Sequence, residues 1–171
     1  MFRPRDTGEL KMRWHYTVGG HLQSIYAAGF IYPEPKNLMT PGGRPHVWFT
    51  SSPVWEETAN KGWRVGNRVR CLTREETAAL CGGLFRFGVG DDYPLHPFTR
   101  ILRESKEQPW VGRGLLEIAL EVGSNPVRDW WGAVHPVPCE QWKALEHFTP
   151  EGWRLFTDVE KIMRGELGAA P

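Results

Sequence analysis

The order of the strand-like and helix-like segments constrains the fold of this chain most strongly. Short runs of aromatic and β-branched residues lie toward both ends of the chain, and helical patterns lie between them. Strands placed in this way do not give the regular strand–helix alternation of a doubly wound parallel sheet. The sequence therefore predicts an α+β fold, with a mixed β-sheet core and peripheral helices.

The expected strands are bounded by glycine and proline. The run HVWFTS at 46–51 is the clearest of them, and Pro53 ends it. The stretch from Pro33 to Pro45 holds four Pro and two Gly and is expected to be a loop, and 53–67 has no clear period. The other expected strands are 13–18, 84–89, 134–138 and 142–148, with a short extended piece at 30–32.

Apolar residues at three- and four-residue spacing predict the helices. The first contains Leu22 and Ile25 and ends at Gly29. Thr73 and Glu76 have the spacing of a capping box and predict the start of a second helix. Further helices are expected at 97–106, at 110–122, and from Thr149-Pro150 through Arg164.

Length and charge narrow the class of protein. The 171 residues fit one domain, 1–171, and we expect frayed ends at 1–11 and 165–171. A formal net charge of +1 argues against a strong nonspecific grip on nucleic acid, although it leaves room for a local basic patch. The polar N-terminus and the lack of an 18-residue apolar run predict a cytoplasmic protein that does not contact a membrane.

Several familiar chemistries have no motif in this sequence. Its three Cys and six His are dispersed, so neither a disulfide framework nor a metal site is predicted. The sequence also lacks the P-loop, dinucleotide, HExxH, GxSxG and kinase patterns. An active site in this chain would therefore have to be assembled from isolated residues on separate elements.

Two clusters of residues could bind a ligand. The first runs from Trp14 to Thr17, where His15 and the hydroxyl groups could bind a ribose or a carboxamide. The glycine pair that follows would let a ligand approach the backbone, although His15 could equally be a structural histidine.

The second cluster is Val47 to Pro53, followed by Glu56-Glu57. Its three consecutive hydroxyl groups could orient a polar ligand against Trp48 and Phe49. Alternatively, they could simply cap the turn after the strand.

In this order the clusters resemble the N-terminal half of the ADP-ribosyltransferase superfamily, and most of all the DNA-targeting toxins of toxin–antitoxin systems. The resemblance covers 13–55, about a third of the chain. It rests on a His-x-Thr strand, a helix with a Leu–Ile–Gly rhythm and a V-x-F-x-x-x-S-P strand. The matching residues are His15, Thr17, Leu22, Ile25, Gly29, Val47, Phe49, Ser52 and Pro53.

The resemblance implies an NAD pocket. It places His15 near the adenosine-side ribose and Tyr16 or Thr17 near the nicotinamide half of NAD. Arg44 would approach the phosphates, and Phe49 with Thr50 would form the nicotinamide wall. The NAD-binding residues it implies are His15, Tyr16, Thr17, Arg44, Trp48, Phe49, Thr50 and Ser51.

The family also requires a carboxylate, usually Glu on a late strand, which stabilises positive charge as nicotinamide leaves. This chain departs from that pattern, because it reads RDWWG at 128–132. The catalytic candidates are Asp129 and Glu140. Either could instead be structural, Asp129 as a surface partner of Arg128 and Glu140 as a turn residue.

Three functions follow from these observations. The first is a mono-ADP-ribosyltransferase that uses NAD as substrate and modifies a protein or nucleic acid, with an antitoxin or inhibitor as a conceivable partner. The second is a catalytically silent binding module on the same scaffold, either a nucleotide sensor or a protein-interaction or inhibitor domain, and the Trp-rich C-terminal half of the chain suits an interface. The third is a single-stranded nucleic-acid binder that stacks bases on Trp, against which the near-neutral charge counts.

Overall fold

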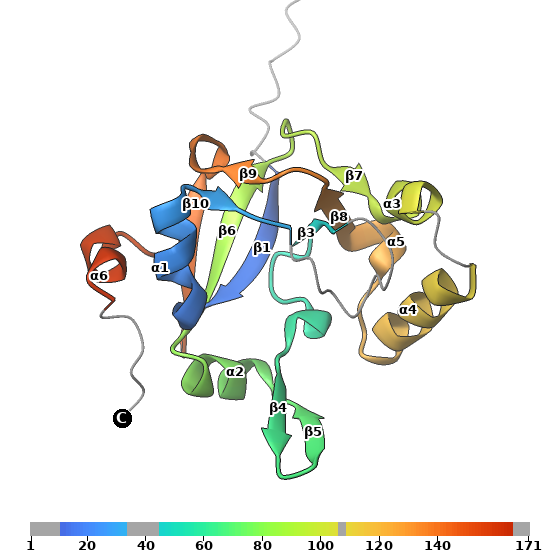
Figure 1. The fold of residues 1–171 in the computed structure, drawn as a ribbon, viewed down its shortest axis with the longest axis horizontal. Coiled ribbons are helices and arrows are strands. Elements are labelled where there is room, and N and C mark those ends of the chain that lie inside the picture. The colour runs from blue at the N-terminus through green and yellow to red at the C-terminus, as the bar shows by residue number, and fades with distance from the viewer. Residues whose placement is uncertain (1–10, 34–44, 106–108, 166–171) are drawn as a thin grey trace, which may run out of the picture.

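A seven-stranded sheet forms the centre of the computed structural model, which describes residues 11–33, 45–105 and 109–165 (Figure 1). The strand order is β11-β10-β6-β1-β3-β8-β7. The sequence predicts a mixed sheet, whereas every described pair is antiparallel. The strands are β1 (Met12–Val18), β3 (Val47–Thr50), β6 (Leu84–Gly90), β7 (His96–Pro97), β8 (Trp130–Ala133), β10 (Ala144–Thr149) and β11 (Gly152–Leu155).

The helices lie around this sheet, which confirms the α+β class of a single compact domain. In Figure 1, α1 and α6 lie together on one side, and α3, α4 and α5 gather on the other. The helices are α1 (Gly19–Ala28), α2 (Arg74–Leu80), α3 (Phe98–Ser105), α4 (Pro109–Glu121), α5 (Pro126–Asp129) and α6 (Val159–Met163), with two short 3-10 helices, η1 (Glu57–Ala59) and η2 (Cys139–Gln141).

Two small antiparallel pairs complete the fold. One joins β2 (Phe30–Ile31) to β9 (Val137–Pro138), and the other is a hairpin of β4 (Gly62–Val65) and β5 (Arg68–Cys71). The hairpin projects away from the sheet at the bottom of Figure 1. The sequence prediction missed it, although Gly66 (φ 59°) and Asn67 form a two-residue turn of a type that hairpins favour.

The predicted helix ends agree with the structure where local side chains decide them. Thr73 and Glu76 form both halves of the capping box at the start of α2. Gly29 ends α1 in the left-handed conformation, with φ 69°, which a residue without Cβ adopts at little cost. These predictions are confirmed.

The predicted C-terminal helix is wrong over most of its length. Thr149 ends β10, and Gly152, at φ 106°, begins β11, which pairs with β10. Trp153 and Phe156 have helical spacing, but pairing with β10 overrides that local preference. Only α6, which Asp158 caps, is helical.

The predicted strand at 134–138 is also displaced. The strand that joins the central sheet is β8, where Trp130 pairs with Thr50 and Trp131 with Phe49. Within the predicted range only Val137–Pro138 is extended, as β9. This register places the chain around Asp129 beside the end of β3.

The contacts at the start of α1 explain why a glycine follows β1 at position 19. A Cβ on Gly19 would lie 1.8 Å from the carbonyl oxygen of Gly82, and the Gly19 amide donates to the carbonyl of Gly83 at 3.0 Å. The sequence suggests that this turn admits a ligand. Instead, the backbone of the turn before β6 occupies the space.

Candidate functional site

A cavity of about 230 Å³ lies where β1, β3 and the segment after β3 meet. Residues from distant parts of the chain line it, among them Glu56, Lys61 and Trp130. The structure also brings to its wall five of the residues that the sequence assigned to an NAD pocket, namely His15, Tyr16, Trp48, Phe49 and Thr50.

His15 is fixed in one orientation at the cavity. Its Nδ1 lies 2.9 Å from the carbonyl oxygen of Trp48, and because a carbonyl only accepts, Nδ1 carries the proton. Burial lowers the pKa of His15 to about 4, so the ring is neutral near pH 7. Nε2 then carries no proton and is an acceptor, suited to a ligand hydroxyl.

Aromatic side chains make the cavity wall apolar. Tyr16 packs edge-on against Trp55, with ring centroids 4.7 Å apart, and burial raises the pKa of Tyr16 to about 12. The indole nitrogen of Trp48 is buried and has no hydrogen-bond partner within the described part of the chain. Because buried donors are normally paired, this unpaired donor is an exception within the described residues around the cavity.

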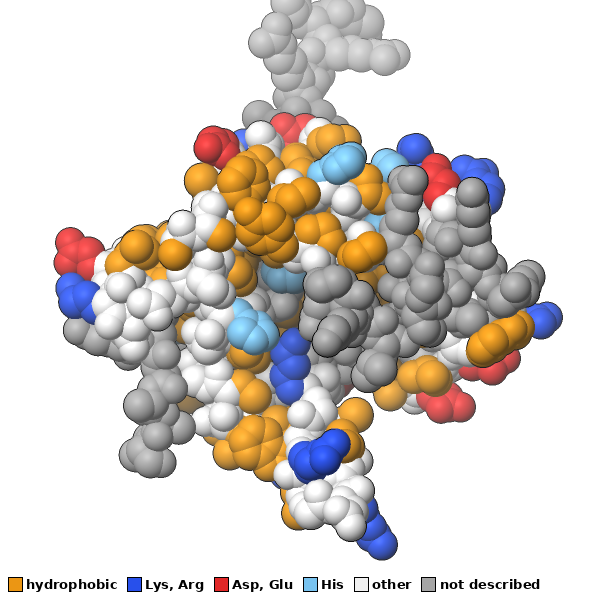
Figure 2. All heavy atoms as spheres, in the orientation of Figure 1, with side chains coloured by type: hydrophobic (Ala, Val, Ile, Leu, Met, Phe, Trp, Pro, Cys, Tyr) orange, Lys and Arg blue, Asp and Glu red, His pale blue; other side chains and the backbone are white. Residues whose placement is uncertain are grey.

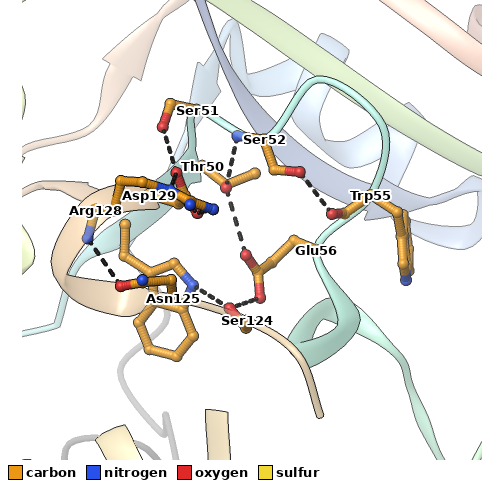
Figure 3. Close-up of polar contacts among 10 residues, drawn as sticks. Thr50, Ser51, Ser52, Trp55, Glu56, Ser124, Asn125, Arg128 and Asp129 are labelled. Carbon is orange, nitrogen blue, oxygen red and sulfur yellow. Dashed lines mark hydrogen bonds and ion pairs between the residues drawn. The ribbon is translucent and has the colours of Figure 1, made fainter. Parts of the chain in front are cut away.

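Glu56 places a carboxylate in this wall. Its side chain is buried, and it accepts from the hydroxyl of Thr58 at 2.8 Å. It also accepts from Thr50 at 3.4 Å and from Ser124, as Figure 3 shows. The Ser124 oxygen in turn accepts from the indole of Trp130 at 3.1 Å. Within the ranges that the structure covers, no Lys or Arg forms an ion pair with Glu56, so neutral hydroxyl groups hold it.

The backbone after β3 explains how Glu56 reaches this position. The chain turns at Ser52, whose hydroxyl donates to the carbonyl of Trp55 at 2.8 Å. Glu56 then caps the short helix η1 and accepts from the amide of Thr58. The sequence prediction included Glu56 in the second cluster without giving it a role.

The hydroxyl run at the end of β3 is used within the protein. Thr50 donates to Glu56 and Ser51 donates to Asp129 at 3.2 Å, as Figure 3 shows. The hydroxyl of Ser52 donates to the carbonyl of Trp55 in the turn that follows β3. Ser51 is not among the residues that line the cavity, although the sequence assigned it to NAD binding.

The two acids proposed from the sequence lie elsewhere. Asp129 ends α5 and forms an ion pair with Arg128 at 2.6 Å, and its carbonyl accepts from the amide of Ser51. Glu140 is exposed on η2. Neither residue lines the 230 Å³ cavity.

A second cavity, of about 490 Å³, adjoins the first. Thr17 lines this one, and Arg44 lies outside the described residues. Together the two cavities suit an elongated ligand with two parts. Their shared lining residues are His15, Tyr16, Trp48 and Lys61.

A buried arginine ties the segment that carries Glu56 to the sheet. Arg86 donates to the carbonyl of Pro53 at 2.7 Å and to the carboxylate of Glu146 at 2.6 Å. Its guanidinium lies between the rings of Trp14 and Trp153, at 3.8 and 4.3 Å from their centroids. The sequence prediction gave Arg86 and Glu146 no role, because their contact joins β6 to β10.

Two further findings concern metals and membranes. In the three described ranges, no group of three or more His, Cys, Asp or Glu side chains is placed to hold a metal ion. None of the helices in those ranges has both the length and the apolar character that crossing a membrane needs.

No protein-family model, curated protein or solved structure matches this chain. The likeness to ADP-ribosyltransferases therefore remains a resemblance in sequence pattern. Any functional conclusion rests on the cavity and the residues around it.

Proposed function

We propose that this protein is an NAD-dependent mono-ADP-ribosyltransferase whose acidic residue is Glu56. The observation that carries the proposal is a buried carboxylate in the same cavity wall as His15 and Phe49. This combination offers one acceptor for a ribose hydroxyl, an aromatic surface for a planar ring and one negative group. Lys61, which lines both cavities, is the cation suited to the NAD phosphates.

The reaction would follow from these groups. The bond between nicotinamide and ribose C1′ breaks, and its electron pair leaves with nicotinamide. Positive charge develops on the ribose, and the Glu56 carboxylate stabilises it in a site with little water. An oxygen or nitrogen of the protein or nucleic-acid acceptor then bonds to C1′ and releases a proton.

One observation favours the second candidate function, a silent binding module. One carboxylate oxygen of Glu56 accepts from Thr58 and Ser124, and the other accepts from Thr50. A carboxylate with these donors in place can serve as an anchor for the wall of the cavity. In that role the protein would bind NAD without cleaving it.

Nicotinamide release from NAD tests both functions. We expect turnover by the wild type and at least about a 100-fold loss in Glu56→Gln, which keeps the shape of the side chain. Glu140→Gln is the matched control, since that residue is exposed, and it should retain activity. Asp129→Asn should lose less than about tenfold, because the Asp129 side chain lies outside the cavity.

Thermal unfolding with and without NAD separates the remaining outcomes. A rise in Tm without nicotinamide release supports the silent module. If NAD neither raises the Tm nor is cleaved to release nicotinamide, both functions are refuted. Loss of turnover in Asp129→Asn but not in Glu56→Gln would return the catalytic role to Asp129.

A further inference from the structure

The β4–β5 hairpin is the most exposed regular element of the described chain. All eight residues of its two strands are exposed. Its base is fixed, because Leu72 is buried and its amide donates to the carbonyl of Lys61 at 2.8 Å. The projecting part is therefore attached at its base and packs against little of the described part of the protein.

The hairpin is basic. Residues 58–73 contain one Lys and three Arg and no acidic residue, in a chain whose formal net charge is only +1. Figure 2 shows Lys and Arg side chains along this projection. Arg70 is paired with Glu76 at 2.7 Å, whereas Arg64 and Arg68 form no ion pair with a described carboxylate.

Strand register places an aromatic ring among these charges. Trp63 pairs with Arg70, and Val65 pairs with Arg68, so the four side chains share one face. Trp63 is 40% exposed and Val65 is 60% exposed. Exposed apolar side chains between cations are costly to leave in water and useful against a partner that is both flat and anionic.

We propose that the β4–β5 hairpin is a binding surface for single-stranded nucleic acid, with an unpaired base stacked on Trp63 and a phosphate on Arg68, which lies on the same face. Arg64 lies on the opposite face and takes a second phosphate where the strand crosses the edge of the hairpin. An exposed indole beside guanidinium groups is the arrangement that stacking on single strands uses. A membrane surface is a poorer fit, because stable attachment needs a continuous apolar face and not one ring among charges.

The location of the hairpin adds to this surface. Lys61 lies at its base and also lines both cavities. A strand bound along the hairpin would therefore continue toward the candidate site. The binding itself depends only on the chemistry of the hairpin and stands whether or not NAD is cleaved.

Fluorescence anisotropy with a labelled 20-nucleotide oligo(dT), without NAD, tests the proposal. Wild type should bind, and two phosphate contacts should make its affinity fall about sevenfold between 50 and 200 mM salt. Arg64→Glu with Arg68→Glu should weaken binding at least about tenfold, and loss of two phosphate contacts should lower the slope of log K against log salt by about 1.4. Trp63→Ala should weaken it about tenfold, and Trp63→Phe less.

The matched control reverses two arginines elsewhere on the surface, Arg113→Glu with Arg154→Glu, both exposed. Its affinity should stay within about twofold of the wild type, and circular dichroism should show all variants folded. The proposal is overturned if wild type does not bind at 50 mM salt, if both double variants weaken binding equally, or if only vesicles containing phosphatidylserine are bound.

Discussion

The two acids beside the end of β3 have opposite surroundings. Glu56 lies in the cavity wall and accepts from three hydroxyl groups. Asp129 lies outside the cavity and is paired with Arg128, whose side chain is 74% exposed. Adjacent hydroxyl groups, on Thr50 and Ser51, donate to the two acids.

The difference shows what a carboxylate needs in order to act on a bound cation. A carboxylate that is already paired with an arginine contributes little net electrostatic field at a bound ligand. An acid held by neutral donors keeps its negative charge available to a ligand. The Glu56 side of β3 is therefore the functional side in our proposal, and the Asp129 side fastens α5 to the sheet.

The largest effect on stability should come from replacing the arginines on the two sides of β3, which are Arg86 on the Glu56 side and Arg128 on the Asp129 side. Arg86→Met removes one partner of a buried ion pair and should lower the free energy of unfolding by about 3–5 kcal/mol. Arg128→Met removes an exposed partner and should cost less than about 1 kcal/mol. Urea unfolding measures both, and losses of equal size would contradict the contrast.

The second largest effect should be a loss of stability at low pH, caused by His15 on the Glu56 side of β3. The pKa of His15 falls from its ordinary 6.5 to about 4 on folding, because the ring is buried. The unfolded chain therefore binds a proton that the folded chain does not, and stability falls as the pH drops from about 6.5 toward 4.

The contribution of His15 between pH 7 and 4.5 should be about 2–3 kcal/mol. Urea titrations at several pH values measure it, with His15→Gln as the control that cannot titrate. The difference in stability between pH 7 and 4.5 should be smaller in this variant by that amount. An identical pH dependence in both proteins would show that His15 is not the group responsible.

The smallest effects on stability are expected when Ser124 and Ser51 are replaced. Ser124→Ala removes a donor to Glu56 and the acceptor of the Trp130 indole, and should destabilise the fold by about 1–2 kcal/mol. Ser51→Ala should cost about 0.5 kcal/mol, since Asp129 keeps Arg128. Thermal unfolding of both variants sharpens the comparison, and a larger loss in Ser51→Ala would reverse it.

Features decided by neighbouring residues could be predicted from the sequence. Two examples are the strand β3, which ends at Thr50, and Gly29, which ends α1. Both follow from local chemistry. The hairpin could not be found from hydrophobic period, because strands exposed on both faces have no buried side to alternate with.

The candidate site also has a part that could be predicted from the sequence and a part that could not. His15 and Phe49 lie on strands whose order could be read from the sequence, and both line one cavity. The position of Glu56 depends on Ser124, which is 68 residues away along the chain and comes close only through the packing of α5 and β8. No spacing rule connects two residues so far apart.

The glycine pair at the start of α1 divides into one replaceable and one irreplaceable residue. A Cβ on Gly20 would meet nothing within 4 Å, whereas one on Gly19 would overlap the backbone of Gly82. During evolutionary divergence, position 20 is free to drift and position 19 is not. A chain that keeps this turn between β1 and α1 is therefore expected to keep glycine at position 19, even where the residues of the cavity differ.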